Sequence, residues 1–168
     1  LMGLSAGTAA GFGAATFYAL TYSVTVAATF GVILLLAGKG FESDRIEDFK
    51  GLVERSPLFA FIMLLLMVSL TGIPGTVGFY AKWMVLGAVI QSGQIWLAVL
   101  AVIAAVVGAF YYLRIVRYCF FDKPVSDTVP ALQPSTGFRA LLAVNGLAVL
   151  VFGLFPGTLI AWCMAAFG

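Results

Sequence analysis

The residues with the clearest chemical potential lie where an apolar segment is interrupted by helix-breaking residues and a cation. Gly72, Pro74, Gly75 and Gly78 follow one another closely, and Lys82 lies about one helical turn beyond them. Proline cannot donate a backbone hydrogen bond and glycine permits unusual backbone angles, so this pattern predicts a break in a helix. Lipid tolerates neither an open backbone nor a lone charge unless protein or water satisfies it. A break beside a cation therefore indicates a functional site.

Lys82 is the residue in this segment that could carry chemistry. Burial disfavours the charged form of a lysine, and a lysine that gains and loses a proton near neutral pH can act as a proton relay. The open carbonyl and amide groups of a helix break can hold water beside it. If the helix resumes at Gly75, then Gly75, Gly78 and Lys82 share one face. The alternative is a structural lysine that pairs with an acid from another part of the protein and holds helices together.

A second group of polar residues lies in the first apolar segment. Tyr18 and Tyr22 are four residues apart, so they lie on one helical face, and Thr21 and Thr25 are close to them. We interpret Tyr18, Tyr22 and Thr25 as candidate members of a polar path through the membrane. The competing interpretation is amphipathic packing, with the tyrosines anchored at the membrane interface.

The elements that position these residues are predicted to be membrane-spanning helices. The chain has 168 residues, of which 62% are hydrophobic and 10% are charged, as expected for an integral membrane protein. Its apolar runs are continuous, whereas the strands of a membrane barrel alternate. We therefore predict an all-α, polytopic transmembrane helix bundle with about four complete spans and the end of another. The two cysteines lack metal-ligand spacing and there is no histidine, so we expect no metal site.

The apolar runs define the spans and their ends. The predicted spans are residues 14–37, 57–91, 95–118 and 138–155, preceded by the tail of a truncated helix at 1–13. Pro156 and Gly157 break the last span. Tyr111, Tyr112 and Tyr118 gather near the end of the span 95–118, a pattern typical of an aromatic belt at the membrane interface.

The topology depends on how residues 57–91 cross the membrane. A straight helix over this segment would be ~52 Å long, well beyond the ~30 Å hydrocarbon core. The segment is therefore one broken crossing or two very short ones. One broken crossing places the two basic loops, 38–56 and 119–137, on the same side, and leaves the uncharged turn 91–94 on the other. The positive-inside rule favours this arrangement, with both basic loops cytoplasmic and the C-terminus on the outer side.

Several motifs in this chain resemble one known family. They are Asp48-Phe49-Lys50-Gly51-Leu52, Ser56-Pro57, Ser69-Leu70-Thr71-Gly72-Ile73-Pro74, Gly78-Phe79-Tyr80-Ala81-Lys82 and Tyr111-Tyr112-Leu113-Arg114. The combination is similar to the antiporter-like subunits of proton-pumping NADH:quinone oxidoreductase, the respiratory complex I. The resemblance extends from about Ala14 to Phe155.

This resemblance implies a role and a setting. It implies that residues 1–168 are the C-terminal part of a longer subunit, that 57–91 is its discontinuous helix, and that Lys82 belongs to its proton channel. NAD, FMN, iron–sulfur clusters and quinone would be bound by other subunits, and no cofactor by this chain. The expected partners are neighbouring membrane subunits and the lipid bilayer of the bacterial inner membrane, without nucleic acid. The alternatives are a subunit of a multi-subunit cation/proton antiporter or of a related membrane-bound hydrogenase, and a purely structural membrane fragment.

Overall fold

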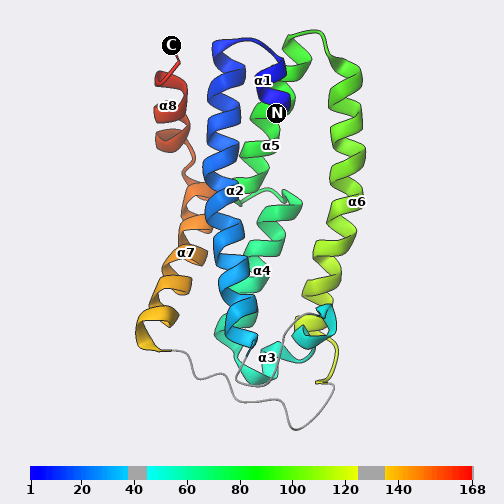
Figure 1. Ribbon diagram of the computed structural model, residues 1–168, viewed down its shortest axis with the longest axis vertical. Coiled ribbons are helices and arrows are strands. Elements are labelled where there is room, and N and C mark those ends of the chain that lie inside the picture. Colours follow the sequence, from blue (N-terminus) through cyan, green and yellow to red (C-terminus); the bar gives the residue numbers. More distant parts are fainter. Residues whose placement is uncertain (38–44, 125–134, 168) are drawn as a thin grey trace.

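The computed structural model describes residues 1–37, 45–124 and 135–167, and within these ranges the chain consists of helices and connecting loops without a strand. The elements are α1 (Met2–Ser5), α2 (Ala9–Leu36), the 3-10 helix η1 (Ile46–Phe49), α3 (Leu52–Arg55), α4 (Pro57–Thr71), α5 (Val77–Gln91), α6 (Ile95–Phe120), α7 (Thr136–Leu154) and α8 (Gly157–Ala165). Figure 1 shows a single upright bundle with both termini at one end and η1 and α3 near the other. The predicted all-α bundle is confirmed.

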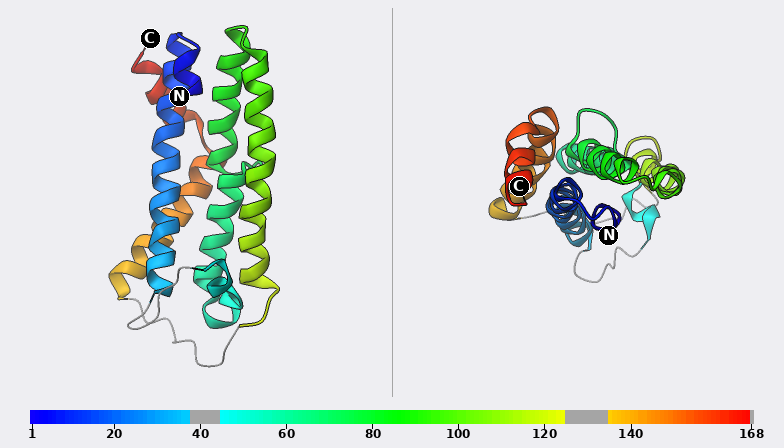
Figure 2. Two further views of the ribbon diagram at one scale, coloured as in Figure 1. Left: turned by 45° about the vertical axis from the view of Figure 1, so that its right-hand side comes forward. Right: turned by 90° about the horizontal axis from the view of Figure 1, so that it is seen from above.

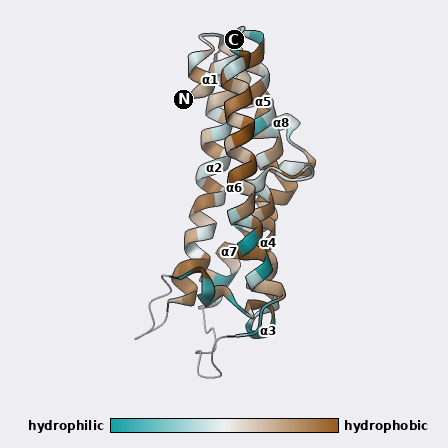
Figure 3. Cartoon of the chain, turned by 90° about the vertical axis from the view of Figure 1, so that its right-hand side faces the viewer, coloured by the Kyte–Doolittle hydropathy of each residue, from teal (hydrophilic) through white to brown (hydrophobic). Residues whose placement is uncertain are grey.

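Three of the helices, α2, α6 and α7, are long and apolar enough to cross a membrane, and α4 and α5 are shorter apolar helices. Figure 3 shows hydrophobic residues along the length of the bundle, while hydrophilic residues gather around α3 at one end. This distribution is that of a membrane-spanning protein whose polar connections lie outside the apolar layer.

The segment 57–91 forms one discontinuous crossing, as predicted. Helix α4 ends at Thr71, and α5 begins at Val77 and continues toward the same end of the bundle (Figure 1). Seen from above, α4 and α5 lie between α7 on one side and α6 on the other (Figure 2). The second half of the crossing begins later than the sequence suggested, at Val77 and not at Gly75, so Gly75 does not share a helical face with Lys82.

The structure moves the start of the first span from residue 14 to Ala9. Thr8 caps this helix, because its side-chain oxygen accepts a hydrogen bond from the Gly11 amide at 3.0 Å. Residues 1–13 are therefore divided between the short α1, a turn in which Gly7 has a φ of 65°, and the first turn of α2. The other spans shift by two residues or fewer, to Ile95–Phe120 and Thr136–Leu154.

The last crossing is also interrupted. Helix α7 ends at Leu154 and α8 begins at Gly157, with Pro156 between them. Helix α8 lies above α7 and continues toward the end of the bundle where the N-terminus lies (Figure 1). Among the residues that the structure describes, the bundle thus contains two broken crossings, and the first carries the lysine.

Candidate functional site

The break after α4 leaves two backbone carbonyls open. Gly72 turns the chain out of the helix with a φ of 87°, and the amide groups of Gly72 and Ile73 both bond to the Val68 carbonyl, at 3.0 and 3.2 Å. In a continuous helix, the carbonyls of Leu70 and Thr71 would accept from the amides of residues 74 and 75. Residue 74 is a proline without an amide hydrogen, and the chain has already left the helix.

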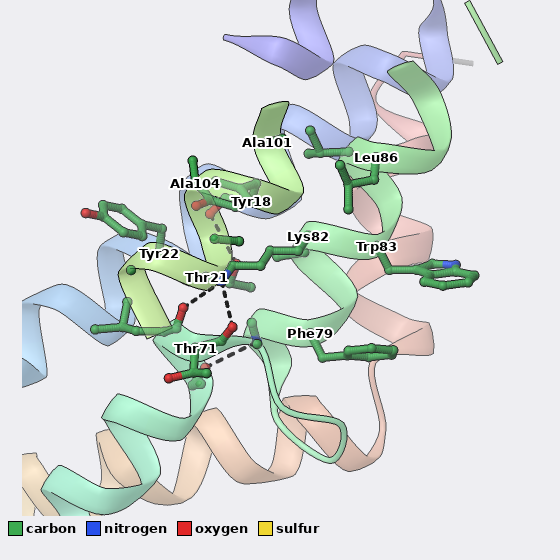
Figure 4. Close-up of a pocket in the computed structure, with 18 of the residues that line it drawn as sticks. Tyr18, Thr21, Tyr22, Thr71, Phe79, Lys82, Trp83, Leu86, Ala101 and Ala104 are labelled. Atoms are coloured by element: carbon green, nitrogen blue, oxygen red, sulfur yellow. Dashed lines mark hydrogen bonds between the residues drawn. The ribbon is translucent and has the colours of Figure 1, made fainter. Parts of the chain in front are cut away.

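Lys82 supplies the missing donors. Its Nζ donates a hydrogen bond to the Leu70 carbonyl and another to the Thr71 carbonyl, both at 2.8 Å (Figure 4). A cation is well placed here, because the C-terminus of a helix carries a partial negative charge. In the part of the chain that the structure describes, these carbonyls are the polar partners of Lys82. A carboxylate partner, the structural alternative, does not lie among the described residues.

Glycines permit the close approach of the two half-helices. Gly78 lies in the first turn of α5, and its amide donates to the Ser69 hydroxyl at 3.2 Å. A Cβ atom at Gly78 would overlap the Ser69 carbonyl oxygen and lie 2.8 Å from the Ser69 carbonyl carbon. A Cβ atom at Gly72 would lie 3.0 Å from Cδ of Lys82. Gly75, with a φ of 96°, lies within the break itself.

A cavity of about 850 Å³ adjoins the lysine between α2, α5 and α6. Its polar lining residues come from all three helices and from the end of α4; they are Tyr18, Thr21, Tyr22, Thr25, Ser69, Thr71, Lys82 and Tyr112. The α6 wall is built mainly of small residues, including Ala101, Ala104, Ala105, Gly108 and Ala109. Tyr18, Tyr22 and Thr25, the three residues of the predicted polar path, therefore line the same cavity as Lys82.

The α2 wall of this cavity can accept hydrogen bonds. The Thr21 hydroxyl donates to the Phe17 carbonyl and the Thr25 hydroxyl donates to the Thr21 carbonyl, each at 2.8 Å. A hydroxyl that donates in this way keeps oxygen lone pairs for another donor. The rings of Tyr18 and Tyr22 stack with their centroids 5.9 Å apart. These groups are suited to holding water next to the lysine.

Tyr112 is a cavity residue that the sequence interpretation missed. That interpretation placed it with Tyr111 and Tyr118 at the membrane interface, but Tyr112 lines the cavity, whereas the side chain of Tyr111 points outward and is 54% exposed. The signal was present in the spacing, because Ala104, Gly108 and Tyr112 are four residues apart and share one face of α6.

The fold and the site define an integral membrane protein with a cation at the break of a discontinuous crossing. Residues 1–108 match the family described as NADH:quinone oxidoreductase/Mrp antiporter, TM. The chain belongs to this family, as its motifs indicated.

Individual relatives agree with the family match. NADH-quinone oxidoreductase subunit N of Alkalilimnicola ehrlichii is 56% identical over 168 residues, which cover 100% of this chain and 34% of that protein. The protein of the same name from Halorhodospira halophila is 54% identical over 172 aligned positions, covering 100% of this chain and 36% of its own length. The chain thus spans about a third of the length of the curated relatives that it matches.

Two solved structures share the fold. Respiratory complex I from Thermus thermophilus with bound aureothin matches with a TM-score of 0.77 and 28% identity, over 91% of this chain and 35% of that chain. The Mrp complex from Dietzia sp. matches with a TM-score of 0.78 and 20% identity, over 98% of this chain and 38% of that chain. At that identity the second match concerns the fold alone.

Proposed function

We propose that the chain is the C-terminal part of subunit N of a proton-pumping NADH:quinone oxidoreductase, with Lys82 as a proton relay. The full subunit couples electron transfer from NADH to quinone, which takes place in other subunits, to proton translocation. The observation that carries this proposal is the position of Lys82, which bonds to open carbonyls at a helix break and borders a largely apolar cavity that also contains several hydroxyl groups. Relatives with the name of subunit N and 54–56% identity support the choice of complex.

The geometry allows Lys82 to exchange a proton without losing its place. An ammonium group has three N–H donors, and two of them hold the Leu70 and Thr71 carbonyls. A neutral amine still has two N–H donors and gains a lone pair. The third N–H group of the ammonium form can therefore pass its proton to water in the cavity, and the lone pair of the amine can take a proton back. Both carbonyl bonds remain throughout. Tyr18, Tyr22 and Thr25 would guide that water along α2.

The membrane orientation follows from charge. We place the subunit in the bacterial inner membrane as a multi-pass protein, with loops 38–56 and 119–137 cytoplasmic and the C-terminus on the outer side. The described basic residues Arg45, Lys50 and Arg55 support this, since they belong to the end of the bundle that holds η1 and α3. NAD, FMN, iron–sulfur clusters and quinone belong to other subunits of the complex, and this chain contacts its neighbouring membrane subunits.

Removal of the gene tests the proposal. Inverted membrane vesicles from a bacterium that lacks the full-length subunit should lose NADH-driven proton pumping, and the restored gene should return it. An antiporter subunit is the second candidate, because the matched family is described as including Mrp antiporters as well as NADH:quinone oxidoreductase. If the vesicles keep NADH-driven pumping and lose sodium-driven proton movement, that candidate replaces the first. Loss of sodium-driven proton movement would also count against a subunit of a related membrane-bound hydrogenase, because removal of such a subunit should affect hydrogen-dependent activity instead.

Tyr112 gives a smaller test of the cavity. Tyr112→Phe in the full subunit should lower the pumping rate per assembled complex about fivefold, because the cavity loses a hydroxyl group that can bond to water, and such a hydrogen bond is worth ~1 kcal/mol. Tyr111→Phe is the matched control, since it makes the same change at the next residue, whose side chain lies outside the cavity lining. Equal rates in the two variants would remove Tyr112 from the path. The measurement is acidification of inverted vesicles, normalised to complex content.

A further inference from the structure

Helix α7 touches the break of the lysine-bearing crossing through its backbone. A Cβ atom at Gly153 would overlap the Cα atom of Thr76 and lie 2.5 Å from the Thr76 carbonyl carbon and 2.6 Å from the Gly75 oxygen. Thr76 is only 4% exposed. Even the smallest side chain at position 153 would therefore push the break and α7 apart.

The residues between α4 and α5, 72–76, make few hydrogen bonds among themselves. Within this segment, the Thr76 amide lies 3.4 Å from the Ile73 carbonyl, a long hydrogen bond, and the Thr76 hydroxyl donates to the same carbonyl at 2.8 Å. Gly75 adopts a φ of 96°, and because glycine has no Cβ atom, it has access to more backbone angles than any other residue would have there. Lys82 and Gly78 join the two half-helices by hydrogen bonds, and packing from outside the crossing adds a contact to the connecting segment itself.

The second broken crossing is shaped to provide that packing. Pro156 interrupts this crossing three residues after Gly153. Helix α7 thus contacts the first break, while α8 packs against α2. The backbones of α8 and α2 also approach each other, although less closely, because a Cβ atom at Gly13 would lie 3.2 Å from the Met164 Cα atom. In Figure 1 the upper end of α7 and the junction of α4 and α5 lie at a similar height in the bundle, on either side of α2 in this view. The interruptions of the two crossings therefore lie next to each other.

We propose that Gly153 is a positioning residue for the lysine site. It acts through Thr76 and Gly75, which set the orientation of α5 relative to α4. That orientation determines the distances from Lys82 Nζ to the Leu70 and Thr71 carbonyls. The inference deepens the proposed function and rests on it. The titratable side chains that share the cavity with Lys82 are Tyr18 and Tyr22 of α2 and Tyr112 of α6, and none of them lies on α7.

Hydrogen exchange tests the contact without reference to activity. In the assembled wild-type complex, the amides of Gly75 and Thr76 should exchange slowly, because Gly153 of α7 packs against these two residues. Gly153→Ala should accelerate their exchange at least about tenfold. Gly157→Ala is the matched control, since a Cβ atom there meets nothing within 4 Å. Fast exchange in the wild type, or equal exchange in the two variants, overturns the proposal, and the wild-type measurement stands even if Gly153→Ala fails to assemble.

The pH profile of pumping tests the effect on the lysine. Gly153→Ala should shift the pH of half-maximal pumping by about 0.5 unit or more, whereas Gly157→Ala should not. A loss of rate by the same factor at every pH would indicate a purely structural role and overturn the proposal. Normal pumping by Lys82→Ala would instead refute the relay, and the exchange experiment would still decide whether Gly153 holds the break.

Discussion

Replacing Lys82 by alanine in the full-length subunit should lower proton pumping per assembled complex by about tenfold or more, because a positioned proton donor and acceptor is lost. The rate is measured as NADH-driven acidification of inverted vesicles, with complex content determined on native gels. Alanine also leaves the Leu70 and Thr71 carbonyls open. Each loses a hydrogen bond to a charged group, worth ~1.5–3 kcal/mol, so part of the effect would come from a weakened helix end.

A second substitution separates these two effects. Lys82→Arg keeps a cation with several N–H donors that can bond to both carbonyls, but a guanidinium does not release its proton near neutral pH. We therefore expect Lys82→Arg to assemble as well as the wild type but to pump well below the wild-type rate, because proton exchange alone is lost. Pumping by Lys82→Arg at the wild-type rate would show that the charge at the helix end matters and proton exchange does not. Lys50→Ala, outside the cavity lining, should pump normally.

Replacing Gly78 by alanine should be the most damaging change to the break itself. The new methyl group would overlap the Ser69 carbonyl oxygen, and backbone atoms cannot turn away as a flexible side chain can. The half-helices would have to separate, with loss of the Gly78–Ser69 hydrogen bond. Such overpacking typically costs ~1–3 kcal/mol. Since Lys82 lies one turn further along α5, its Nζ would also move away from the carbonyls.

Gly87→Ala provides the matched control for Gly78→Ala. Both residues lie in α5, but a Cβ atom at Gly87 meets nothing within 4 Å. There the substitution should stabilise the helix by ~1 kcal/mol through its propensity alone. We expect assembly and pumping to fall several-fold in Gly78→Ala and to stay at wild-type levels in Gly87→Ala. A Gly78→Ala subunit that assembles and pumps normally would contradict the close packing of α4 and α5.

The broken crossing was predictable because its causes are local. Pro74 lacks an amide hydrogen wherever it stands, and an apolar segment of ~52 Å cannot cross a ~30 Å layer as one straight helix. The resumption of the helix was harder to place. Gly75 was the expected point, but the helix begins at Val77, because the chain needs the extra residues to move α5 alongside Ser69.

The partners of the site residues could not be predicted in the same way. The aromatic-belt interpretation of Tyr112 did not reveal its place in the cavity lining, because a tyrosine near the end of a span suits either an interface or a cavity. Only the rotation of α6 relative to α2 distinguishes Tyr112 from its exposed neighbour Tyr111. Gly153 gave no signal, because its partners, Gly75 and Thr76, are distant in the sequence.

The sequence by itself determined that this protein is an all-α membrane protein, that its second crossing is interrupted, and that a lysine stands just beyond the interruption. These features follow from apolar run length, from the missing amide of Pro74 and from the rarity of charge in such runs. The tertiary structure alone decided that Lys82 bonds to the Leu70 and Thr71 carbonyls and that the two interruptions lie side by side. The physical reason is that open backbone groups must find partners across space, and the packing of helices decides which partners come within reach.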